Sequence, residues 1–178
     1  MDILEELMQD AESCGFSHYG ELDASTIEVY QAARDACAEN KCNRYGTNWS
    51  CPPGCGTLDE CINKIRQFKR GILVQTTGDI DPFKYDTYLE VGRQHNKRFA
   101  EYCRIVKQKV PGALLCGANA CENCTECTYP DAPCRFPDLL SYPMEGMGMM
   151  VSEVCKRNGM KYHYGSGTIT YISCVLID

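Results

Sequence analysis

The sequence contains no run of about 18 apolar residues, the length that a helix needs to cross a bilayer. Residues 1–10 also lack the basic region and the apolar core of a secretory signal peptide. We therefore expect a cytoplasmic protein with no membrane partner.

Basic residues are too few to suggest a nucleic-acid partner. The formal net charge is -6 at pH 7, and an acidic surface repels phosphate backbones. The densest basic group is better explained as the solvated face of one helix: Lys64, Arg66, Lys69 and Arg70. We expect no nucleic-acid binding, whereas the acidic surface would suit a basic redox partner protein.

Common enzyme signatures are also missing. There is no phosphate-binding loop and no dinucleotide-binding glycine fingerprint, because Gly165-Ser-Gly167 is too short and precedes a predicted strand. No nucleophile and base form a recognisable pair. The three histidines are isolated, and lone histidines are more often surface or core residues than ligands: His18, His95 and His163.

Cysteine, in contrast, is abundant, with 14 among 178 residues. In a reducing cytosol, and especially in that of an anaerobe, so many thiols indicate metal binding or redox chemistry more than a disulfide scaffold. The length predicts a single domain over residues 1–178, large enough to bury a core without help from metal.

The downstream cysteine group has the most specific spacing. Three cysteines follow at C-x2-C-x2-C spacing and a fourth lies in Ala-Pro-Cys-Arg: Cys121, Cys124, Cys127 and Cys134. This spacing is typical of an iron–sulfur site, because iron in such clusters takes soft thiolate ligands. Six residues separate the third and fourth cysteines, and Pro133 precedes the last one, so the fourth ligand could come from elsewhere. Zinc, which more often uses two separated pairs, is the alternative metal.

The upstream group is the second candidate site. Its predicted ligands are Cys37, Cys42, Cys51 and Cys55. Pro52, Pro53 and Gly54 resemble a metal-holding turn, since prolines fix the approach and glycine lets backbone amides face a ligand. A disulfide-tied loop is the alternative. Cys61 is a substitute ligand inside a predicted helix, and Cys116 is the reserve for the downstream group.

The remaining cysteines and the methionines are predicted to pack. Cys14, Cys103, Cys155 and Cys174 lie in predicted helices or strands, where cysteine acts as a small buried hydrophobe. The methionines are expected to fill a core or an interface: Met144, Met147, Met149, Met150 and Met160.

Periodicity and capping signals predict alternating helices and strands. Helices are expected over residues 2–14, 25–37, 57–69, 82–110 (with Gly92 as a candidate interruption) and 143–158. Strands are expected over 16–22, 71–76, 113–116 and 168–177. The fold class is α/β or α+β, a single-layer sheet of about four to five short strands with flanking helices and two cysteine-rich cluster-binding loops that meet on one side.

Several motifs occur in an order that suggests a family. They are Cys37-x4-Cys42-x2-Tyr45-Gly46-x2-Trp49-x-Cys51-Pro52-Pro53, then Gly117-Ala118-x2-Cys121 with Cys124 and Cys127, then Pro133-Cys134-Arg135-x-Pro137, and Met144-Glu145-Gly146-x-Gly148. The chain resembles a family of cysteine-rich bacterial and archaeal proteins described as predicted metal-binding proteins (domain of unknown function 2284). The resemblance covers almost the whole chain. It implies ligand roles for Cys37, Cys42, Cys51, Cys121, Cys124, Cys127 and Cys134, and it implies no reaction.

Three hypotheses about function follow. The sequence favours an iron–sulfur protein with two 4Fe-4S clusters that acts as an electron carrier or accessory redox subunit. The alternative is an iron–sulfur enzyme with an open cluster iron acting on a small molecule, in a dehydratase-like or desulfurase-like reaction, with Arg135 or the Tyr162-His163-Tyr164 stretch handling substrate. The third is a zinc-binding structural or interaction module.

Overall fold

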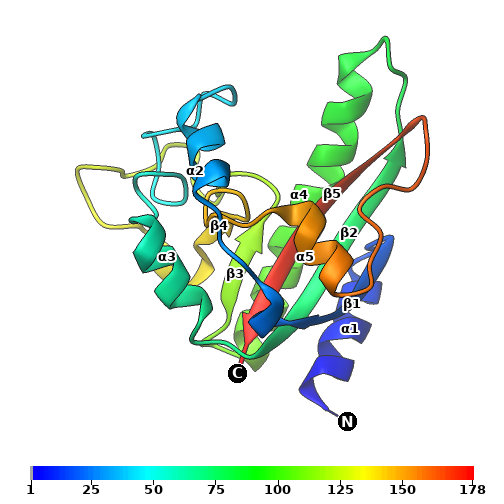
Figure 1. Ribbon diagram of the computed structural model, residues 1–178, viewed down its shortest axis with the longest axis horizontal. Helices are drawn as coiled ribbons and strands as arrows, with labels where there is room; N and C mark the ends of the chain where they lie inside the picture. Colours follow the sequence, from blue (N-terminus) through cyan, green and yellow to red (C-terminus); the bar gives the residue numbers. More distant parts are fainter. Residues whose placement is uncertain (1) are drawn as a thin grey trace.

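The β-branched run at the end of the sequence forms the middle of the sheet, as its composition predicts. This strand, β5 (Thr168–Ile177), pairs antiparallel with β2 (Arg70–Asp79) on one side and with β3 (Leu114–Gly117) on the other. The order is β1-β2-β5-β3-β4, and only β3 and β4 run parallel. The computed structural model describes residues 2–178 (Figure 1). The remaining strands are β1 (His18–Asp23) and β4 (Ser141–Pro143), and two short 3-10 helices are η1 (Ala24–Thr26) and η2 (Pro137–Leu139).

One face of the sheet packs against α1 (Ile3–Ser13) and α4 (Tyr85–Lys109). Alternate residues of β2 point into this layer, because side chains along a strand alternate between its two faces. The candidate interruption at Gly92 is wrong, since α4 continues through it. A Cβ atom at Gly92 would lie 3.1 Å from the Tyr171 ring, so glycine here lets β5 approach the helix closely.

The other face packs against α3 (Leu58–Ile65), α5 (Val151–Arg157) and a methionine-rich turn, and Figure 1 shows α5 in front of β2 and β5. Met144, Met147 and Met149 are fully buried here, as expected for core filling. Cys103, Cys155 and Cys174 are buried as predicted, whereas Cys14 is half-buried. The sequence-based fold class is confirmed: a mixed α+β fold with one open five-stranded sheet and flanking helices.

Helix starts were predicted with mixed success. Thr57 and Glu60 form the expected capping box of α3. The box expected from Ser25 to Glu28 is wrong, because Asp23 caps a 3-10 turn there and Glu28 pairs with Arg157 at 3.0 Å instead. The helix α2 begins only at Gln31 and ends at Ala38.

The helix expected over 143–158 is also wrong in its first half. Residues 144–148 form a tight turn, in which Met147 donates its amide to the Pro143 carbonyl at 3.1 Å. Gly148 takes a φ of +87°, outside the helical region, and Met149 then forms a bridge with Val29. Helical structure starts at Val151.

His95 is a core residue, in line with the expectation for an isolated histidine. Its Nδ1 lies 3.0 Å from the Thr76 hydroxyl and its Nε2 lies 2.7 Å from the Ser173 hydroxyl. Burial lowers the pKa of His95 to about 3, which keeps the ring neutral. None of the helices in the part of the chain described here is long and apolar enough to cross a membrane.

Candidate metal centre and adjoining pocket

The two cysteine loops lie against each other, as the sequence predicts. The upstream loop (residues 39–57) connects α2 to α3, and the downstream loop (residues 118–136) connects β3 to η2. The Cys121 amide donates to the Ser50 hydroxyl at 2.9 Å, and the Trp49 indole donates to the Ala132 carbonyl at 3.0 Å. Arg44 adds a hydrogen bond to the Cys121 carbonyl at 3.3 Å. Three side chains of the upstream loop therefore hold backbone groups of the downstream loop in place.

A buried asparagine shapes the upstream loop around Cys51. The Asn48 side-chain oxygen accepts hydrogen bonds from the Ser50 amide at 3.0 Å and from the Cys51 amide at 2.9 Å. Earlier in the loop, Asn40 and Asn43 take positive φ values of 53° and 57°, which asparagine tolerates better than most residues. These two turns carry the chain around the exposed Cys42.

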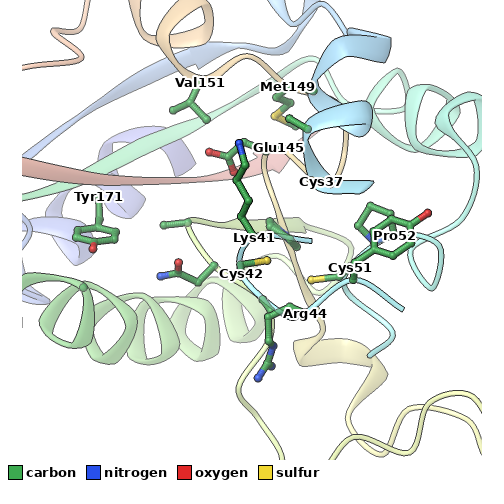
Figure 2. Close-up of a pocket in the computed structure, with 18 of the residues that line it drawn as sticks. Cys37, Lys41, Cys42, Arg44, Cys51, Pro52, Glu145, Met149, Val151 and Tyr171 are labelled. Carbon is green, nitrogen blue, oxygen red and sulfur yellow. The ribbon is translucent and has the colours of Figure 1, made fainter. Parts of the chain in front are cut away.

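Three upstream cysteines open onto one pocket of about 840 Å³: Cys37, Cys42 and Cys51. Its walls come from α2, α4, the start of α5 and both loops, and are largely made of small and apolar side chains. In Figure 2 the sulfur atoms of Cys42 and Cys51 point toward each other. Burial, with smaller contributions from Glu145, Cys51 and Cys42, raises the pKa of Cys37.

Cys55 does not line this pocket, although its thiol interacts with that of Cys51. It is 2% exposed and packs with the fully buried Cys61 in the core. The Arg34 guanidinium, reaching over from α2, lies 3.5 Å from the Cys61 sulfur and 3.8 Å from the Cys55 sulfur. The hydrogen bond between the two thiols, with the charges of Arg34 and Lys64, lowers the pKa of Cys61 to about 7 although burial opposes it, and the same bond raises the pKa of Cys55.

The downstream cysteines are all half-buried in one loop: Cys121, Cys124, Cys127 and Cys134. Burial raises the pKa of Cys121, and Cys134 and Cys124 add to the shift, so these thiols interact. Arg135 donates to the Glu126 carbonyl at 2.7 Å and thus closes the loop on itself. The reserve ligand Cys116 is fully buried in the core with Cys174, apart from this loop.

The thiols do not form a finished metal site. Within residues 2–178, no three cysteine, histidine or acidic side chains are grouped tightly enough to hold a metal ion, and all fourteen cysteines are free. Their chemistry nevertheless fits a thiophilic group, because each loop offers three or four soft sulfur donors of the type that zinc and iron–sulfur clusters take. Binding would require each loop to draw its thiols together.

Glu145 is a pocket residue to which sequence reasoning gave no role. It lies in the turn between Pro143 and Gly148, and its side chain faces the pocket in Figure 2. Solvent reaches the carboxylate through the pocket, but protein surrounds its other sides, and this burial raises the pKa of Glu145. The Met-Glu-Gly-x-Gly motif was the available signal, since two glycines closely following a single acid mark a tight turn that presents it.

Arg34 fastens the parts of the pocket together. It donates to the Gly56 carbonyl at 2.7 Å and to the Gly146 carbonyl at 3.2 Å, so one side chain joins α2, the upstream loop and the turn that carries Glu145.

Replacing Arg34 with alanine should lower the free energy of unfolding by about 2 to 3 kcal/mol, because two carbonyl groups would lose a charged donor. Urea unfolding measures the change, and labelling with a thiol reagent should show faster reaction of Cys55 and Cys61. Arg104→Ala is the matched control, since Arg104 is an exposed α4 residue with no hydrogen bond or ion pair among residues 2–178. Equal effects in both variants would contradict a fastening role.

The family model described as predicted metal-binding protein (DUF2284) matches residues 20–177 of this chain. No curated protein and no solved structure matched the sequence or the fold of this chain. The matched segment includes both cysteine loops, the pocket and the turn that carries Glu145. The chain therefore belongs to this family of predicted metal-binding proteins.

Proposed function

We propose that this protein binds two iron–sulfur clusters, one in each cysteine loop, and that the upstream cluster acts on a small molecule held in the pocket. The observation that carries the proposal is the division of the upstream cysteines. Cys37, Cys42 and Cys51 line the pocket, while Cys55 packs away from it in the core.

Three thiolates facing a pocket supply three of the four protein ligands that a saturated four-iron cluster takes. A cluster bound there would offer an iron with a free position, able to act as a Lewis acid toward an oxygen or nitrogen of a small molecule. The pocket of about 840 Å³ is within the size range of small-molecule sites. Its apolar walls, including Pro52 and Met149, would limit the access of water to that position.

The downstream loop supports an electron-transfer role for the second cluster. It offers four thiols at spacing typical of iron–sulfur sites, and they lie partly exposed where a partner could approach. The hydrogen bond between Cys121 and Ser50 would place this cluster beside the upstream loop. A redox partner with a basic surface would suit the net charge of -6.

A second candidate is the electron carrier without substrate chemistry that the sequence alone favours. The observation in its favour is the close contact of the two loops, which hold seven cysteines and have Cys37 of α2 beside them. Cys55 would complete the upstream set if the loop rearranged. The two candidates differ in whether an iron stays open to external ligands.

The test is anaerobic purification followed by iron, sulfide and zinc analysis and by EPR of the reduced protein. We expect about eight iron and eight sulfide per chain, and a change in one of two cluster signals on addition of cyanide. Unchanged signals would support the carrier. Stoichiometric zinc with negligible sulfide would contradict both iron–sulfur candidates and support the zinc module.

A further inference from the structure

Glu145 is the one acidic or basic side chain lining the pocket that forms no hydrogen bond or ion pair with another residue among residues 2–178. Lys41 pairs with Glu39 at 2.6 Å, and Arg93 pairs with Glu90 at 2.9 Å. The other two are held by neutral groups: Arg44 donates to the Cys121 carbonyl at 3.3 Å, and Glu122 accepts from the Asn96 amide at 3.3 Å.

Three charged groups of the pocket have no oppositely charged partner among residues 2–178, namely the Arg44 guanidinium and the carboxylates of Glu122 and Glu145, and of these only Glu145 also lacks a hydrogen bond with another residue. The surrounding protein raises the pKa of Glu145, its own backbone amide opposes the shift, and no cationic side chain contributes. A cation brought next to Glu145 would favour its ionised form.

The walls suit an apolar molecule with an aromatic or aliphatic body. The Tyr171 hydroxyl donates to the Tyr88 carbonyl at 3.2 Å, which holds its ring at the pocket wall. Figure 2 shows Tyr171 at one end of the pocket and Pro52 with Cys51 at the other. A cation near a tyrosine ring gains further attraction from its face.

We propose that the pocket binds an amine: a small molecule whose ammonium group pairs with the Glu145 carboxylate and whose apolar body lies along the wall formed by Tyr171. In so far as this molecule is the substrate, the inference rests on the proposed function. Its place beside Cys37, Cys42 and Cys51 would bring the amine-bearing carbon skeleton next to the upstream centre.

The experiment is isothermal titration of the anaerobically purified protein at pH 7 with three probes of matched size: phenethylammonium, 2-phenylethanol and 3-phenylpropionate. We expect phenethylammonium to bind with one-to-one stoichiometry and at least tenfold more tightly than the other two. Glu145→Gln should weaken phenethylammonium binding tenfold or more and leave that of 2-phenylethanol unchanged. Glu21→Gln, which alters an exposed β1 carboxylate outside the pocket, should keep the original affinity.

Thermal unfolding of both variants establishes that they are folded, since glutamine keeps the shape of glutamate. Tighter binding of 3-phenylpropionate, no binding of any probe, or equal affinities in Glu145→Gln and Glu21→Gln would each overturn the inference. The metal and cyanide measurements are independent of these titrations. Amine binding to a zinc-loaded protein would uphold the amine inference and contradict the proposed iron–sulfur function. A cyanide response without amine binding would support the proposed function and contradict the amine inference.

Discussion

Replacing Cys124 with alanine should remove about half of the iron, because each of two four-iron clusters carries half of it. Cys124 is the middle member of the C-x2-C-x2-C run, and its neighbours cannot reach its position without distorting the loop that Arg135 closes. The upstream thiols belong to another segment and should keep their cluster. Iron and sulfide analysis, with EPR of the reduced protein, should show one of two signals lost.

The matched control is Cys103→Ala, which removes a thiol buried between α4 and the sheet, outside both loops. It should retain all iron even if it lowers stability. Loss of all iron from a Cys124→Ala protein that remains folded would mean that the two loops share one centre. A shared centre is the competing arrangement because the two loops are in direct contact through Ser50 and Cys121.

Gly148→Ala should lower the free energy of unfolding by roughly 3 to 5 kcal/mol, the sum of backbone strain and overpacking. Gly148 has a φ of +87°, and a Cβ there would lie 2.4 Å from Val29 Cγ1 and 2.7 Å from Leu58 Cδ1. The segment before α2 and the start of α3 would both have to move. Urea unfolding provides the measurement.

Gly159→Ala separates the two causes of this loss. Gly159 also has a positive φ, +70°, but no atom lies within 4 Å of the position that its Cβ would take. This variant should cost about 1 kcal/mol, from backbone strain alone. If both variants lost the same stability, the tight packing around Gly148 would contribute nothing.

Sequence patterns predicted those elements of the fold whose signals are local. The strand ending at Ile177 and the capping box at Thr57 depend on residues within a few positions of each other, and both are confirmed. The Ser25 box failed because Asp23, Asn158 and Arg157 offered the same segment other hydrogen bonds, some from more than a hundred residues away. Residues 143–150 failed because burial of three methionines on the sheet outweighed their helical preference.

The candidate site was predictable in its chemistry and only partly in its geometry. Spacing alone indicated two thiol groups, and the loops do meet. Spacing could not reveal that Cys55 faces Cys61 and Arg34, because that depends on how α2 crosses over the loop. Nor could it identify Glu145, whose distinction is that it lacks a partner in the folded chain. The ligand set itself, Cys37, Cys42, Cys51, Cys55, Cys121, Cys124, Cys127 and Cys134, stays a prediction.

The pairing of β3 with β4 places both ends of the segment between them at the same edge of the sheet. Leu115 lies beside Ser141 and Gly117 beside Pro143, so residues 118–140 leave the sheet and return to it through neighbouring parallel strands. Neighbouring strands lie about 4.8 Å apart, so both ends of the insert are anchored in the same small patch of the sheet. The segment of residues 118–140, which carries the downstream cysteines, could therefore be replaced as a unit, or vary in length and in number of ligands, while the five-stranded sheet stays intact.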